Sequence, residues 1–164
     1  MRVAPVGFAF SNVDEVLSEA ERSAAVTHNH PEGIKGAQAT ALAVFMGRSG
    51  ASKAEIRDEL VRRFGYDLRR SIDEIRPGYQ FDVSCQGSVP EAIVAFMDSV
   101  GVEDAIRLAI SLGGDSDTQA AIAGGIAHAF YGHVPDTIVA PVRQRLPPEF
   151  LEVIDAFERA FPVR

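Results

Sequence analysis

Hydrophobic and polar positions recur with helical spacing over most of the chain. Between residues 11 and 28, apolar side chains fall three or four positions apart, on one face of a helix, at Val13, Val16, Leu17 and Ala20. Comparable patterns with start or stop signals predict further helices at 30–48, 52–65, 71–77, 88–100, 101–113 and 147–161. The apolar stripe of the last segment predicts that this helix belongs to the core. The fold class predicted by these segments is all-α.

Residues 76–92 interrupt the helical pattern. They contain Gly78, Gly87 and Pro90 with β-forming residues between them, which predicts an ordered loop or a short extended piece. A single short strand does not make a sheet, so the fold class stays all-α. The 164 residues are enough for one domain with a substantial core.

A run of small residues at 119–131 predicts an unusual helix. It carries Gly124 and Gly125 in its middle, and each glycine costs about 1 kcal/mol relative to alanine. That cost is typical of a helix against which other helices pack very closely. Because the run is apolar on nearly every side, we expect it to be buried, with its N-terminus opening into a cleft.

Three oxygen-bearing side chains stand directly before this helix, at Asp115, Asp117 and Thr118. The two carboxylates point apart in a regular helix, but they converge if Asp115 lies at the N-cap, as the flexible Gly113 and Gly114 allow. Hard oxygens of this kind suit Mg²⁺. The commoner alternative for such a pattern is that Asp115 only caps the helix with its side chain.

The composition of the chain limits the classes of binding partner and the cellular compartment that are expected. The net charge of −7, with lysines and arginines scattered, argues against a nucleic-acid or anionic-membrane partner. The one cysteine, Cys85, excludes an internal disulfide and favours a reducing cytoplasm. The first ten residues lack the features of a secretory signal, and no apolar run is long enough to span a bilayer.

The segment "GGDSDTQAAIAGGIAHAFYG" at 113–132 resembles the motif of the ADP-ribosylglycohydrolases, which include the dinitrogenase-reductase-activating glycohydrolases. The resemblance extends upstream to "FDVSCQGSVPEAIVAF" at 81–96, to "VTHNHPEGIKGAQATALAV" at 26–44 and to "MRVAPVG" at 1–7. It thus covers about the whole chain. It implies a compact orthogonal multi-helix bundle that forms part of that family's fold.

Carried over position by position, the resemblance implies specific site residues. Asp115, Asp117 and Thr118 would ligate magnesium. The other implied positions bind the substrate: His28 lines the ADP-ribose pocket, Gly114 lets the ligand approach, Arg2 lies near the diphosphate, and the stretch 85–89 borders the pocket. The implied reaction is magnesium-assisted hydrolysis of the glycosidic bond between ADP-ribose and an acceptor such as an ADP-ribosylated protein.

Part of the family pattern is absent. The sequence contains no G-D-x-x-G segment and no Thr-Asp-Asp-Thr motif, which supply the remaining ligands of the family's two-magnesium centre and its catalytic base. We therefore expect residues 1–164 to form a single domain that lacks the family's N-terminal half, with no identifiable catalytic residue.

Three interpretations stay open: a hydrolase, a non-catalytic fragment or binding module, and one half of an enzyme completed by a second chain. Helices 34–46 and 119–131 are apolar enough that the isolated chain is expected to expose them and self-associate.

The remaining histidines and the cysteine have plainer interpretations. His30 is predicted to be an exposed turn residue, because a zinc site with His28 and Glu32 lacks further ligands nearby. Cys85 has no recognisable base partner and is predicted to be an ordinary buried thiol. His128 is predicted to be a packed polar residue.

Overall fold

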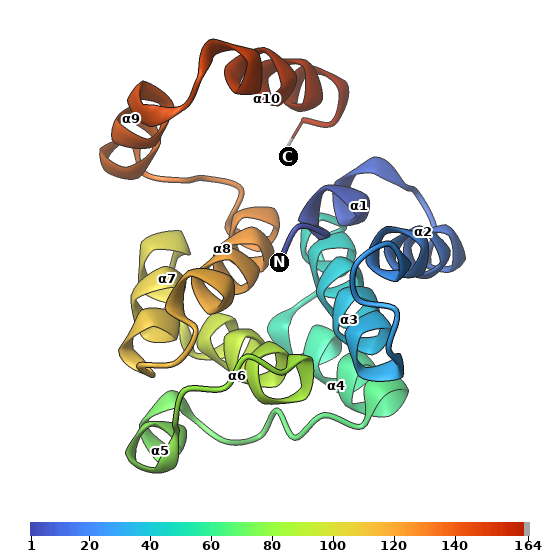
Figure 1. Cartoon of the computed structure of the whole chain (residues 1–164), viewed down its shortest axis with the longest axis vertical. Helices are drawn as coiled ribbons and strands as arrows, with labels where there is room; N and C mark the ends of the chain where they lie inside the picture. The colour runs from blue at the N-terminus through green and yellow to red at the C-terminus, as the bar shows by residue number, and fades with distance from the viewer. Residues whose placement is uncertain (163–164) are drawn as a thin grey trace.

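The computed structural model describes residues 1–162 and shows the predicted all-α class, without any strand in that range (Figure 1). The helices are α1 (Ala4–Ala9), α2 (Val13–Ala25), α3 (Pro31–Arg48), α4 (Lys53–Phe64), α5 (Ile72–Ile75), the 3₁₀ turn η1 (Arg76–Gly78), α6 (Cys85–Asp98), α7 (Val102–Ser111), α8 (Ser116–Tyr131), α9 (Asp136–Arg145) and α10 (Pro148–Ala160).

Helix α8 lies at the centre and packs against α3, α6 and α7. Its two glycines allow close packing on different sides. A Cβ atom at Gly124 would lie 3.1 Å from Cγ1 of Ile106 in α7, and one at Gly125 would lie 3.1 Å from Cβ of Ala4 in α1. The close approach predicted from these glycines is therefore present, and a side chain at either position would require its neighbour to shift.

Helix α3 is enclosed by the chain's own helices. It contacts α1, α2, α4, α6 and α8, and its residues from Ala39 to Val44 are buried. In α8, Ile122 and Ile126 are buried in the same way. The expectation that these two helices lack cover is therefore wrong, because α1, α4, α6 and α7 supply it.

The local start signals explain several helix boundaries. Ser52 and Ser71 each form the full capping box, with Glu55 and Glu74 respectively. The predicted loop 76–92 is wrong in its second half, because Ser84 accepts a hydrogen bond from the backbone N–H of Gly87 and starts α6 at Cys85. Pro90 lies inside this helix without ending it.

The C-terminal part differs from the prediction. Helix α9 was not predicted, and neither α9 nor α10 contains a buried residue. In α10, Phe150 is 56% exposed and Val153 is 68% exposed, so the prediction that this helix belongs to the core is wrong. It contacts the core through Phe157, whose ring packs edge-to-face on Phe8 with the centroids 6.4 Å apart. Among residues 1–162, no helix is both long and apolar enough to cross a membrane.

Candidate functional site

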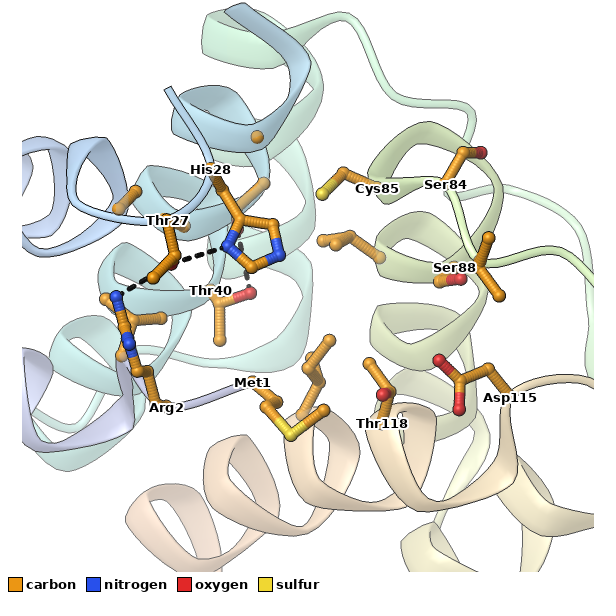
Figure 2. Close-up of a pocket in the computed structure, with 18 of the residues that line it drawn as sticks. Met1, Arg2, Thr27, His28, Thr40, Ser84, Cys85, Ser88, Asp115 and Thr118 are labelled. Carbon is orange, nitrogen blue, oxygen red and sulfur yellow. Dashed lines mark hydrogen bonds between the residues drawn. The ribbon is translucent and has the colours of Figure 1, made fainter. Parts of the chain in front are cut away.

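A cavity of about 450 Å³ lies between the N-terminal ends of α3, α6 and α8 (Figure 2). Five separate segments of the chain line it: residues 1–3, 23–28, 33–40, 83–89 and 115–122. In Figure 2, His28 faces Asp115 and Thr118 across this space, and Cys85 and Ser88 form a third side. The fold thus brings together residues that are up to about 120 positions apart in the sequence.

Asp115 is the N-cap residue of α8, but its side chain makes no capping hydrogen bond. The chain enters the helix through Gly113, whose φ of +76° lies in the left-handed region that favours glycine. Asp115 lines the cavity. The interpretation of Asp115 as a simple helix cap is therefore not what the structure shows, because its side chain lines the cavity and does not bond the backbone of α8.

The two neighbouring oxygen donors differ in position. Thr118 lines the cavity together with Asp115, whereas Asp117 is exposed and is not among the lining residues. A hydrogen bond with the Asp115 carboxyl, and a second from the backbone N–H of Thr118, lower the pKa of the Asp117 carboxyl. Asp115 and Asp117 therefore converge at the start of α8, as the N-cap position predicts.

Gly114 is not brought to the cavity. A Cβ atom at this position would lie 2.5 Å from Cε1 of Tyr79, so the aromatic ring occupies the space beside it. The structure therefore explains the absence of a side chain at Gly114 by contact with Tyr79. It does not place Gly114 where the predicted approach of a ligand would occur.

Arg2, Thr27 and His28 form a hydrogen-bonded row along one wall (Figure 2). The Arg2 guanidinium donates to Oγ1 of Thr27 at 2.8 Å and to the backbone oxygen of Ser23 at 2.9 Å. Oγ1 of Thr27 lies 2.7 Å from Nδ1 of His28. Because Arg2 has only donors, the Thr27 hydroxyl accepts from it. The hydroxyl oxygen has a second lone pair and one proton, so its hydrogen bond with Nδ1 fits either tautomer of the His28 ring.

The remaining residues with possible chemistry have structural contacts. Cys85, Ser88 and Val89 line the cavity, and Cys85 is half-buried where the sequence predicted a buried thiol. His30 is exposed and caps α3 by accepting from the backbone N–H of Glu32. His128 packs beside the ring of Phe8, and burial lowers its pKa. Within residues 1–162, no group of three or more His, Cys, Asp or Glu side chains is placed to hold a metal ion.

Two residues beside the site were missed by the sequence analysis. The Tyr79 hydroxyl donates to the backbone oxygen of Gly87 at 2.8 Å and accepts from Nε2 of Gln119 at 2.6 Å. Gln119 is completely buried. A signal for it existed, because Gln119 directly follows the acidic motif and is the one amide in an otherwise small and apolar run.

The sequence model of the ADP-ribosylglycohydrolase family matches residues 1–163 of the chain. The chain belongs to the ADP-ribosylglycohydrolase family. Human ADP-ribosylhydrolase ARH3 is 31% identical over 84% of this chain and 51% of its own length. An uncharacterized protein of Archaeoglobus fulgidus is 30% identical over 93% of this chain and 54% of its own length. ADP-ribosylarginine hydrolase Tri1 of Pseudomonas putida is 30% identical over 94% of this chain and 40% of its own length. The chain thus spans about half the length, or less, of these curated relatives.

Proposed function

We propose that this chain forms the ADP-ribose-binding and magnesium-binding wall of an ADP-ribosylglycohydrolase. Such an enzyme hydrolyses the glycosidic bond between ADP-ribose and an acceptor. The observation that carries the proposal is that Asp115 and Thr118 share one cavity with His28 and Arg2. The names of the relatives, ADP-ribosylhydrolase and ADP-ribosylarginine hydrolase, support the same class of substrate, an ADP-ribosylated protein.

The oxygen donors fit a magnesium ion. Asp115 makes no capping bond, Asp117 converges on it, and the Thr118 hydroxyl lies one residue further. Mg²⁺ prefers such oxygens and keeps several of its waters, so these three groups suit one hydrated ion but are too few for two. When bound, the metal would orient ribose hydroxyls and polarise water.

The opposite wall suits the rest of the ligand. Arg2 carries a permanent positive charge at the cavity and is held by Thr27, which makes it a candidate for the diphosphate. The Nε2 atom of His28 is not engaged by Thr27, which bonds Nδ1, and would form a hydrogen bond with ADP-ribose. Both side chains come from segments whose sequence resembles the family.

The hydrolytic step needs more than this wall provides. Glycosidases usually employ two carboxylates, one on each side of the scissile bond. Among residues 1–162, Asp115 is the only acid that lines the cavity. We therefore propose little or no turnover by the chain alone, and we keep the alternative of a non-catalytic or ADP-ribose-binding module that needs a second chain. A cytoplasmic location remains a prediction from the single cysteine.

Calorimetric titration with ADP-ribose, with and without Mg²⁺, tests this proposal. We expect binding that Mg²⁺ strengthens, and Asp115→Asn should weaken the magnesium-dependent part by roughly tenfold, since a charged contact contributes about 1.5–3 kcal/mol. Asp136→Asn is the matched control, because Asp136 lies in the first turn of α9, outside the cavity.

Release of ADP-ribose from an ADP-ribosylated protein is measured in parallel. Binding without release supports the module. Release at an enzymatic rate shows that this chain holds a complete catalytic centre. Absence of ADP-ribose binding contradicts both.

A further inference from the structure

We propose that Tyr79 is a positioning residue for the acidic end of α8: its side chain fixes the turn 113–115 and thereby the direction of the Asp115 carboxylate. This inference rests on the proposed function, because it concerns how the magnesium ligands are held. Tyr79 belongs to the loop between η1 and α6, more than thirty residues before the acidic motif. The residues around Tyr79 in the sequence do not indicate that it contacts the acidic motif.

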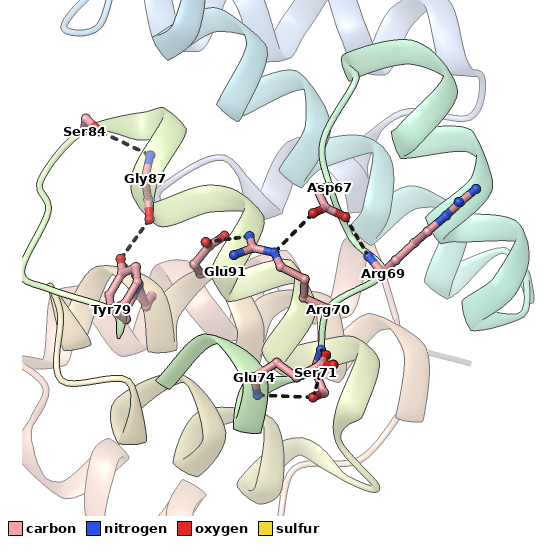
Figure 3. A network of polar contacts seen from close by, with 10 residues as sticks. Asp67, Arg69, Arg70, Ser71, Glu74, Tyr79, Ser84, Gly87 and Glu91 are labelled. Atoms are coloured by element: carbon pink, nitrogen blue, oxygen red, sulfur yellow. Dashed lines mark hydrogen bonds and ion pairs between the residues drawn. The ribbon is translucent and has the colours of Figure 1, made fainter. Parts of the chain in front are cut away.

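The Tyr79 hydroxyl connects two walls of the cavity. It donates to the backbone oxygen of Gly87 in the first turn of α6, as Figure 3 shows, and it accepts from Nε2 of Gln119 in α8. The distances are 2.8 and 2.6 Å. Gly87 itself is held by Ser84, whose hydroxyl accepts its backbone N–H at 3.1 Å. One hydroxyl therefore joins the starts of α6 and α8.

The Tyr79 ring restrains the turn from the other side. A Cβ atom at Gly114 would lie 2.5 Å from Cε1 and 3.2 Å from Oη of Tyr79, so the ring is in contact with the backbone at that position. Gly113, directly before it, is in the left-handed conformation. Without the ring, this glycine pair would have many conformations available, because glycine restricts the backbone least.

Gln119 transmits the contact to Asp115. Its backbone N–H donates to the backbone oxygen of Asp115 at 2.9 Å, which closes the first turn of α8. Its side chain is completely buried, and Oε1 has no hydrogen-bond partner. The bond to Tyr79 is thus the one side-chain hydrogen bond that fixes the Gln119 amide among the described residues.

The position of Asp115 depends on this arrangement because its own side chain does not cap the helix. The backbone of the turn, together with the contact with Asp117, sets where its carboxylate points. Loss of the Tyr79 hydroxyl frees the Gln119 amide and loosens the first turn of α8. The wall that carries Arg2 and His28 is built from other helices and is unaffected. The effect of Tyr79 is therefore expected mainly in the magnesium-dependent part of binding, although the hydroxyl also contacts Gly87 at the start of α6.

Tyr79→Phe tests this, because it keeps the ring and removes only the hydroxyl. Two quantities are measured: ADP-ribose affinity with and without Mg²⁺, and hydrogen exchange of the backbone amides at 116–119. We expect the magnesium-dependent gain in affinity to fall roughly tenfold, the affinity without Mg²⁺ to stay unchanged, and exchange at 116–119 to accelerate.

Tyr66→Phe is the matched control. Tyr66 is buried, and its hydroxyl has no hydrogen-bond partner, so its removal should change neither the affinity nor exchange at 116–119. A general loss of packing would lower the affinity with and without Mg²⁺ equally in Tyr79→Phe, and that result would overturn the proposal.

Gln119→Leu provides a second route to the same bond. It should reproduce the loss seen in Tyr79→Phe, and the double variant should lose no more than either single variant, since residues that act through one interaction are not additive. Additive losses would overturn the coupling. If the wild type shows no response to Mg²⁺, the proposed function fails. The positioning role is then still decided by exchange: unchanged exchange at 116–119 in both single variants would refute it.

Discussion

A helix with a distinct apolar face is usually buried more deeply than one without such a face, but helices α8 and α10 show the opposite. Helix α10 has a distinct apolar stripe with Phe150 and Val153, and neither residue is buried. Helix α8 has no such stripe, because small residues surround it on nearly every side, and it lies at the centre with Ile122 and Ile126 fully covered. The apolar side chains of α10 are the larger ones, yet they contribute less to the core.

The difference lies in what surrounds each helix. Helices α3, α6 and α7 pack along α8. Its two glycines leave room for the side chains of Ile106 in α7 and Ala4 in α1. Helix α10 follows the segment 132–135 and α9, and Figure 1 shows this pair beside the body of the molecule with its own end near α1. An apolar stripe indicates that one face of a helix can pack against other elements. Small residues on all sides indicate that neighbours pack closely around the helix, because only such packing offsets the loss of helix stability that glycine causes.

The largest expected difference between the two helices is in hydrogen exchange. Amides in the middle of α8 should exchange only when the whole chain unfolds, whereas those of α10 should exchange by local opening. With a typical stability of about 5–15 kcal/mol, the rates should differ by roughly a thousandfold or more. Native-state exchange measured by mass spectrometry or NMR decides this. Equal protection in both helices would show that α10 is an integral part of the core.

Truncation of one side chain in each helix gives the next largest effect. Ile126→Ala should reduce the free energy of unfolding by about 2–5 kcal/mol, because it leaves a cavity where three helices meet. Val153→Ala in α10 should change it by less than about 0.5 kcal/mol, because the side chain is mostly in solvent. Denaturant unfolding of both variants measures the contrast, and similar losses would remove it.

A third comparison uses the ion pairs of the two regions. In the body, Arg70 donates to Glu91 at 2.9 Å, and Glu91 is only 8% exposed (Figure 3). Burial raises the pKa of Glu91 in spite of Arg70. The fold therefore favours the protonated carboxyl. The protonated Glu91 carboxyl contributes fully to stability below the ordinary pKa of a glutamate. This contribution is lost as the pH rises through the raised pKa of Glu91 in the folded protein.

Arg70→Met should increase this dependence on pH. Without its partner, Glu91 would be buried unpaired, and the free energy of unfolding at neutral pH should fall by about 1–3 kcal/mol, with recovery as the pH is lowered. Glu91→Gln combined with Arg70→Met should remove the dependence. Thermal melts between pH 4 and 8 measure both variants, and a melting temperature of Arg70→Met that rises with pH across this range would contradict the sign.

The smallest effect is expected at the corresponding pair in the C-terminal region. Arg143 of α9 and Asp155 of α10 lie 2.5 Å apart, and both are partly exposed. Exposed pairs contribute little because water and salt screen them. Arg143→Ala should leave the melting temperature within error of the wild type. A decrease comparable to that of Ile126→Ala would show that α9 and α10 are held together, and to the body, more firmly than their burial indicates.

The sequence predicted what depends on local spacing. The burial of α8 follows from Gly124 and Gly125, and the convergence of Asp115 and Asp117 follows from the glycines before them. The predicted start of α6 at residue 88 is three residues late, because residues 85–87 were assigned to the loop 76–92, although Ser84 caps the helix that begins at Cys85. Helix α1 was missed because its six residues are too few to show a period.

Other features were beyond the sequence because they depend on contacts between distant segments. The exposure of α10 follows from where the preceding turn directs it, and its own residues carry no information about that. The contact of Tyr79 with Gly114 joins positions that no local pattern relates. The placement of Arg2 beside Thr27 is of the same kind. The part of the site that the sequence did not predict is therefore the set of contacts between segments that are far apart in the chain.

The cavity has a consequence for the time at which the protein becomes able to bind. Its walls include residues 1–3 and residues 115–122, which are more than 110 positions apart. At a synthesis rate of about 5–20 residues per second, the first wall leaves the ribosome many seconds before the last. Before the later segment has emerged, the cavity is incomplete. Ligand present in the cell therefore acts only once both segments are available, and it then favours the folded state by mass action.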